Sequence, residues 1–316
     1  MKLIEILTQA LELFAALAAA PLFLGWVNQC RAWLQNRRAP SVWLPYRGIR
    51  KLFHKDAVIA DNASALFRIA PYIVFGSMVL AAGIIPSMGT RLPFTIAADA
   101  IALVGLLTTA RVFLSLAAMD IGTAFGTLGA RREMMVGFLA EPALLMVIFV
   151  ASMIYATTAL PAISEHLATQ GLALYPSLAF TAVAFTLVLL AENARIPIDN
   201  PATHLELTMI HEAMVLEYSA RHLALMEWAA ALKLFNYACI GFALFIPWGM
   251  AAGEIGPVAL LASIPLLGVK LIGAGAGLAL IETVSAKLRV FRAPEFLAAA
   301  FIFAVLGLLV HLLLGA

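Results

Sequence analysis

The chain has 316 residues, of which 63% are hydrophobic and 12% are charged, and its formal net charge is +2. Soluble globular proteins carry about twice that share of charged residues. The composition therefore excludes a water-soluble fold and indicates a polytopic membrane protein. Cys30 and Cys239 are the only cysteines, too few for the four thiolates that usually hold an iron–sulfur cluster. We therefore expect this chain to bind no redox centre, and any electron carrier to lie on a partner or to be a bound organic molecule.

Eight apolar segments reach the length needed to cross a bilayer, about 20 residues. The first carries Glu5 and Glu12 and no small-residue cleavage site, so we expect a retained helix rather than a signal peptide. The sequence predicts an all-α fold in which residues 1–316 form a single membrane domain, one bundle of about eight transmembrane helices. The predicted helices are residues 3–27, 69–89, 95–119, 136–158, 172–191, 229–250, 257–281 and 294–314.

Basic residues gather in alternate connections between these segments. Fifteen of the 20 lie in residues 28–68, 120–135, 192–228 and 282–293, whereas the opposite connections hold only Arg91. The positive-inside rule places the four basic connections in the cytoplasm. We therefore expect a multi-pass protein of the inner (cytoplasmic) membrane with both termini in the periplasm.

The first basic connection contains an amphipathic pattern. Tyr46, Ile49, Leu52 and Phe53 share one side of a helical wheel, and basic residues fill the other side. This pattern predicts an in-plane helix at the membrane surface over residues 46–55. The alternative is a solvated basic loop that only sets the topology.

Several ionisable residues lie inside the predicted spans, among them Asp99, Arg111, Glu141, Lys233 and Lys270. Each costs about 3 kcal/mol at the centre of a membrane helix. Asp99 and Arg111 are separated by about 18 Å of helix, so each needs a partner on another helix. We interpret these residues as a buried polar line across several helices; structural ion pairs, or side chains that reach the membrane surface, are the alternative.

Residues 191–227 combine acidic side chains with three of the six histidines, between two apolar segments. Pro197 and Pro201 exclude a continuous helix over residues 196–201, and a new helix capped by Asn200 is expected to follow. On that helix His204, His211 and His222 would share one face, and Glu206 and Glu217 would lie eleven residues apart, about 16 Å.

A metal site does not fit this spacing. His204 and His211 would lie about 10 Å apart along the helix, too far for one ion. His211 and Glu212 begin an HExxH pattern, but Val215 occupies the position of its second histidine. An ion path is the better functional interpretation, because intramembrane carboxylates and histidines commonly relay protons; an acidic surface that docks a basic partner is the alternative.

We assign two groups of residues from these patterns, and no catalytic, cofactor-binding or metal-binding residue. The predicted ion path comprises Glu141, Glu192, Asp199, His204, Glu206, His211, Glu212, Glu217, Lys233 and Lys270. The predicted docking surface for a peripheral partner comprises Arg37, Arg38, Arg47, Arg50, Lys51, Arg195 and Arg221.

A longer signature supports a family assignment. Residues 192–219 read ENARIPIDNPATHLELTMIHEAMVLEYS, and residues 37–55 read RRAPSVWLPYRGIRKLFHK. Both resemble the membrane-anchor subunit of group 4 nickel–iron hydrogenases, the formate hydrogenlyase or hydrogenase-4 type, which is related to subunit 1 of respiratory complex I. The resemblance extends to the eight-helix layout. The match to complex I is looser, because Ala202 and His204 stand where that family tends to place acids.

The resemblance implies a non-catalytic subunit of an oxidoreductase complex, one that docks a peripheral arm and couples electron transfer to ion translocation. It implies as partners a nickel–iron large subunit, a small iron–sulfur subunit, a ferredoxin-like iron–sulfur subunit and antiporter-like membrane subunits. The nickel–iron centre and the iron–sulfur clusters would then belong to those partners. Two alternatives stay open: a quinone-site anchor subunit of NADH-quinone oxidoreductase, and a secondary ion transporter, against which the missing internal repeat argues.

Overall fold

The fold was obtained as a computed structural model, which describes residues 2–90, 99–169, 175–199, 209–251, 257–288 and 292–314. Over these residues the chain is almost entirely helical, and its only extended pairings are two isolated bridges, Gly89 with Ala251 and Asp99 with Ala159. The predicted all-α class is therefore confirmed.

Each of the eight predicted spans coincides with a helix. Seven helices in the described part of the chain are long and apolar enough to cross a membrane, and α7 is a shorter apolar helix of 17 residues. The eight are α1 (Lys2–Leu34), α3 (Ala65–Ile84), α4 (Ala100–Asp120), α5 (Ala124–Tyr155), α7 (Pro176–Glu192), α9 (Ala220–Phe245), α10 (Pro257–Val284) and α11 (Ala293–Leu314). Residues 95–98 and 172–174 of the predicted spans lie outside the described residues.

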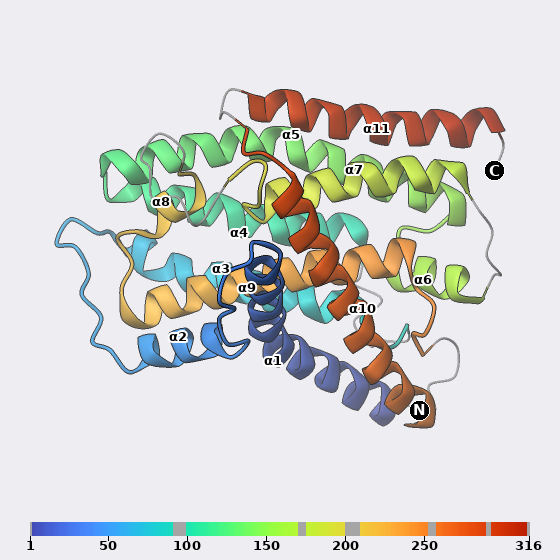
Figure 1. The fold of residues 1–316 in the computed structure, drawn as a ribbon, viewed down its shortest axis with the longest axis horizontal. Coiled ribbons are helices and arrows are strands. Elements are labelled where there is room, and N and C mark those ends of the chain that lie inside the picture. The colour runs from blue at the N-terminus through green and yellow to red at the C-terminus, as the bar shows by residue number, and fades with distance from the viewer. Residues whose placement is uncertain are drawn as a thin grey trace.

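Most of these helices lie side by side, as Figure 1 shows. Neighbouring pairs include α3 with α4, α5 with α7, α7 with α11, and α3 with α9. The helix α9 is the most enclosed span. By contrast, α10 runs obliquely across the others and packs mainly along α1 (Figure 1).

Three short helices complete the fold: α2 (Leu44–Phe53), α6 (Leu160–Thr169) and α8 (His211–Val215). The amphipathic helix predicted at residues 46–55 is present as α2. Its Ile49 is buried, whereas Arg47, Arg50 and Lys51 are exposed, and it packs against α9 and α1. Its in-plane orientation stays a prediction.

The predicted loop over residues 120–135 is wrong, because α5 already begins at Ala124. The hydroxyl of Thr123 accepts a hydrogen bond from the Gly126 amide and so caps the helix. Two charged residues of this segment have partners inside the bundle. Arg132 donates to the carbonyl of Met209 at 2.8 Å, and Glu133 is buried beside Arg111.

The predicted single helix through the histidines is also wrong where the structure describes it. Helix α8 ends at Val215 and α9 begins at Ala220, so His211 and His222 lie on different helices. The turn between them is held by contacts outside the segment. Tyr218 donates to the carbonyl of Phe67 at 3.0 Å and stacks on its ring. Residues 200–208, with Asn200, His204 and Glu206, lie outside the described residues.

Candidate functional site

Arg111 is the centre of a buried charge network. This side chain of α4 is only 6% exposed and contacts three carboxylates from two other helices. Its Nε lies 3.6 Å from Glu133 Oε1, and its Nη1 lies 2.5 Å from Glu141 Oε1, both on α5. Its Nη2 pairs with Glu192 at the end of α7. Three acceptors around one planar guanidinium satisfy a charge that would otherwise be very costly to bury.

The spacing on α5 explains how one arginine reaches both of its glutamates. Glu133, Gly137 and Glu141 follow one another at intervals of four residues, so they share one face of the helix. Gly137 leaves the space that the Arg111 side chain occupies, because a Cβ there would lie 2.8 Å from Arg111 Cδ.

Lys233 extends the network to a fourth helix. Its Nζ lies 3.0 Å from Glu192 Oε2, so Glu192 pairs with a cation through each of its two oxygens. We call the five residues Arg111, Glu133, Glu141, Glu192 and Lys233 the charge network. It holds three carboxylates and two cations, so it carries one excess negative charge when every group is ionised. A proton can therefore be accommodated without leaving an unbalanced positive charge.

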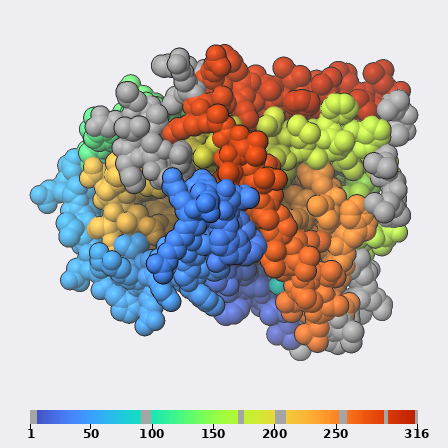
Figure 2. Space-filling view, in the orientation of Figure 1, coloured from blue at the N-terminus to red at the C-terminus, as the bar shows by residue number. Residues whose placement is uncertain are grey.

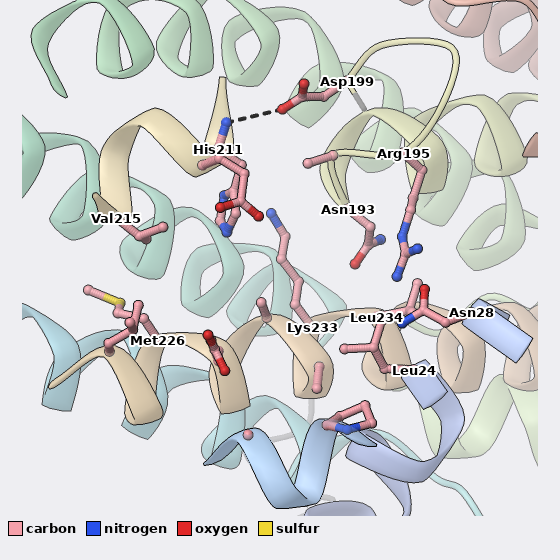
Figure 3. A pocket seen from close by; sticks show the side chains of 18 of the residues that line it. Leu24, Asn28, Asn193, Arg195, Asp199, His211, Val215, Met226, Lys233 and Leu234 are labelled. Carbon is pink, nitrogen blue, oxygen red and sulfur yellow. Dashed lines mark hydrogen bonds between the residues drawn. The ribbon is translucent and has the colours of Figure 1, made fainter. Parts of the chain in front are cut away.

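The charge network opens into a cavity of about 650 Å³ between α1, α2, α8, α9 and the end of α7. Glu192 and Lys233 belong to both. Figure 3 shows Lys233 rising from α9 into this space, between His211 and Asn193. The volume is typical of a pocket for a small organic molecule. The other charged or imidazole side chains that line it are Arg31, Arg195, Asp199, His211, Glu212 and Glu227.

Glu282, at the end of α10, forms ion pairs with two residues that line one wall of the cavity. Its carboxylate is buried and lies 3.3 Å from Arg195 Nη1 and 3.6 Å from Arg31 Nη1. Arg195 is itself only 6% exposed. Burial lowers the pKa of its guanidinium, and the neighbouring Glu282 opposes that effect. Glu282 thus joins α1, α10 and the segment after α7.

Asp199 fixes the start of α8. The Asp199 carboxylate accepts a hydrogen bond from the amide of Ile210 at 3.3 Å. It accepts a second from the amide of His211 at 3.2 Å, which Figure 3 shows. It also lies 3.9 Å from Lys287 Nζ. Partial burial lowers the pKa of Lys287, and Asp199 partly offsets this. A carboxylate at the start of a helix stabilises the unpaired amides there.

The structure brings six of the ten predicted ion-path residues to this site. Glu141, Glu192 and Lys233 belong to the charge network, and Asp199, His211 and Glu212 line the cavity. Glu217 is exposed in the turn before α9 and lies in neither group. The predicted helix that would carry Glu217 is interrupted between α8 and α9, and Glu206 lies outside the described residues.

Two other intramembrane charges have local roles. Lys270 donates to the carbonyl of Ile246, just after the end of α9, at 2.7 Å, so it stands apart from the charge network. Asp99 was expected inside a span, but it precedes α4 and caps it by accepting a hydrogen bond from the Ile101 amide at 3.2 Å.

The predicted docking residues divide into exposed and buried positions. Arg195 is buried and paired with Glu282, so the prediction that it docks a partner is wrong. The remaining six are exposed, namely Arg37, Arg38, Arg47, Arg50, Lys51 and Arg221.

Sequence reasoning missed three carboxylates of the described site, Glu133, Glu282 and Glu227, the last of which lines the cavity. Glu133 was placed in a loop, although its spacing to Gly137 and Glu141 matches one helical face. Glu282 was placed at the edge of a basic connection, where nothing in the local sequence reveals that α1 and the segment after α7 meet it. Arg111 was expected to need a partner, but its role as the centre depends on the packing of four helices.

Comparison with known proteins identifies the family of this chain. The NADH dehydrogenase family matches residues 7–313. Formate hydrogenlyase subunit 4 of Escherichia coli K12 is 33% identical over 95% of this chain and 96% of its own length. Hydrogenase-4 component C of the same organism is 36% identical over 74% of this chain and 73% of its own length.

A solved structure has the same fold. A chain of the membrane-bound sulfane sulfur reductase, an archaeal respiratory membrane complex, superimposes with a TM-score of 0.83 at 20% identity and covers 95% of this chain and 97% of its own. Because the family match spans residues 7–313 and two relatives above 30% identity cover 95% and 74% of this chain, this chain belongs to the NADH dehydrogenase family.

Proposed function

We propose that the chain is the membrane subunit of an energy-converting hydrogenase complex. In this role it docks a peripheral nickel–iron and iron–sulfur arm on its cytoplasmic side and relays ion movement through the charge network. Its similarity to formate hydrogenlyase subunit 4 and hydrogenase-4 component C supports the hydrogenase assignment. The complex lies in the inner membrane, with both termini of this chain in the periplasm.

The observation that carries the proposal is the continuity of the charge network from the cavity to the side of the bundle. Glu192 and Lys233 line the cavity, Arg111 is buried between them and α5, and Glu141 has a side chain that is 27% exposed. A change of charge in the cavity therefore acts on Glu141 through a chain of direct contacts. Because the intervening groups are buried, solvent screens these interactions weakly.

The partial exposure of Glu141 also supports a neighbouring membrane subunit. Glu141 lies within α5, a span in which a carboxylate facing lipid is costly. Exposed apolar residues flank it on the same helix, including Phe138 and Leu145. We place an antiporter-like subunit on this face, where its polar groups would meet Glu141 away from lipid.

The peripheral arm would dock at the opposite side of the cavity from Glu141. Helix α2 presents Arg47, Arg50 and Lys51 outward while Ile49 packs inward. These cations suit the acidic surface of a soluble partner. The partners proposed here are a nickel–iron large subunit, a small iron–sulfur subunit and a ferredoxin-like subunit, and the redox centres belong to them.

A second candidate function is a quinone-site anchor of an NADH-quinone oxidoreductase. The cavity of about 650 Å³ favours it, because it combines polar residues with an apolar wall and is large enough for a small aromatic ring system. The two candidates differ in what the cavity does: a relay needs water and titratable groups there, whereas an anchor needs an organic ligand.

Purification of the tagged chain in mild detergent tests the proposal. We expect nickel–iron and iron–sulfur subunits to co-purify, with hydrogen-dependent reduction of an artificial acceptor. Co-purification with NADH-oxidising subunits, together with quinone-dependent turnover, would favour the second candidate. Recovery of the chain without redox subunits would contradict both.

A further inference from the structure

A second cavity lies between α7, α9 and α10, and its lining contains no member of the charge network. Its volume is about 270 Å³, and none of its lining residues is charged. Its polar side chains are Thr186, which donates to the carbonyl of Ala182 at 2.8 Å, and the buried Tyr237. A polar ligand would find few partners here, whereas a hydrocarbon chain would bury apolar surface on every side.

Small residues and the tilt of α10 create this cavity. Because α10 packs along α1 and has few contacts with α9, a wedge of space separates it from the α7 and α9 pair. Ala182, Gly241 and Ala274 line the wedge from α7, α9 and α10. Figure 2 shows α10 as a ridge that crosses this face of the molecule.

A cation stands at the rim of the cavity. Ile246 and Phe242 line the cavity near the end of α9, and Ile246 is 48% exposed. Lys270 Nζ donates to the Ile246 carbonyl at 2.7 Å and lies 5.9 Å from the centre of the Phe242 ring. An ammonium group has three donors, and within the described part of the chain Lys270 uses one of them. Two donors can therefore meet a further acceptor.

The position of this rim near one end of the bundle suits a lipid headgroup. Helix α9 starts beside α2 and α8 and ends at Phe245, so Ile246 lies toward the end of the bundle away from α2. Lys270 lies within α10, yet its long side chain reaches that end of α9. A long lysine side chain places its ammonium group closer to headgroup level than the backbone from which it extends.

We propose that the cavity binds one acyl chain of a phospholipid, whose phosphate pairs with Lys270. An anionic amphiphile fits this site for three reasons. The wedge is apolar, it opens at the exposed end of α9, and a cation with spare donors lies at that opening. The lipid comes from the leaflet on the side opposite α2. This proposal is independent of the hydrogenase assignment, because none of its residues belongs to the charge network.

Native mass spectrometry of the intact complex, purified in mild detergent, tests the acyl chain. Ala274→Phe places a ring inside the cavity, whereas Ala276→Phe makes the same change two residues away at an exposed position that does not line the cavity. We expect the wild type and Ala276→Phe to retain a phospholipid that Ala274→Phe has lost. Equal retention in all three proteins would overturn the proposal.

Lys270→Gln tests the headgroup and covers the case in which Ala274→Phe fails to assemble. The delipidated complex is offered phosphatidylglycerol or phosphatidylcholine. We expect the wild type to prefer phosphatidylglycerol and Lys270→Gln to lose about fivefold of that preference, the factor that corresponds to about 1 kcal/mol per basic residue at an anionic surface. An unchanged preference would overturn the role of Lys270. A separate experiment tests whether a protein occupies the opening. If Ile246→Cys cross-links to another subunit in native membranes, a protein helix lies there and the lipid proposal fails.

Discussion

Arg111 shows at the residue scale why so many charges can be buried in one apolar bundle. It meets Glu133, Glu141 and Glu192, and Glu192 also meets Lys233. Removing one member of such a group leaves its partners buried and unpaired, which costs about 3–5 kcal/mol for a buried ion pair. The intact network by itself adds little stability, because desolvation offsets most of the attraction between the charges. Its presence in a membrane helix bundle therefore favours a functional role.

Gly137 allows a direct test of this geometry. In Gly137→Ala the added methyl group would lie 2.8 Å from Arg111 Cδ and must displace that side chain. We expect a loss of about 1–3 kcal/mol, as for other overpacked sites, measured as thermal stability of the purified protein in detergent.

Gly76→Ala is the matched control for this change. Gly76 lies within helix α3, and an added Cβ there would meet nothing within 4 Å. Alanine should stabilise the helix slightly, by about 0.5–1 kcal/mol. If both variants lost stability equally, tight packing of α5 against Arg111 would be refuted.

At the scale of the elements, the sequence predicts the spans well and the connections poorly. Apolar length alone identifies α3, α7 and α11, because any helix that crosses hydrocarbon needs such a segment. The sequence predicts the starts of α5 and α9 too late, because charged residues follow each start within three turns. In α5 these include Arg132 and Glu133, whose partners come from elsewhere in the chain. The break before Ala220 depends on Tyr218 reaching Phe67, a contact that no local pattern reveals.

The prediction that a peripheral partner docks on this chain concerns helix α2. Charge reversal of its outward face, Arg50→Glu with Lys51→Glu, should release the peripheral subunits while the helical bundle stays inserted. The expected cause is repulsion from an acidic partner surface. Co-purification of the arm with the tagged chain measures it.

Arg68→Glu serves as the control for the reversal, because Arg68 is an exposed cation on α3 outside the predicted docking surface. The arm should stay bound in this variant. If the arm also stays bound when Arg50 and Lys51 are reversed, the basic residues of α2 set topology and do not dock a partner.

For the whole molecule, the arrangement of helices gives the two ends of the bundle different character. The end with α2 and α8 holds the exposed basic residues and the polar cavity, whereas the end with α6 holds few charges. We predict that the first end faces the cytoplasm. Because both native cysteines are buried, single cysteines at exposed positions report orientation without interference.

Arg38→Cys and Thr169→Cys place one exposed thiol at each end. An impermeant thiol reagent added to intact cells should label the cysteine at position 169 and spare the one at position 38. In inverted vesicles the labelling should be reversed. The same labelling of both positions from one side would refute the topology.

The central claim is that the charge network moves ions in response to redox chemistry. Glu141→Gln keeps the size and most of the hydrogen bonding of the side chain but removes its charge and its titration. Glu295→Gln, at an exposed carboxylate in the first turn of α11, is the matched control. Both complexes should assemble with their full set of subunits.

The decisive measurement is hydrogenase-driven proton or cation movement in vesicles that contain the assembled complex. The account predicts that Glu141→Gln slows coupled ion movement by on the order of 10²-fold, the lower range for loss of a positioned proton-transfer group, and so lowers the ratio of ions to electrons, while Glu295→Gln behaves as the wild type. Normal assembly with an unchanged ratio of ions to electrons in Glu141→Gln would contradict it.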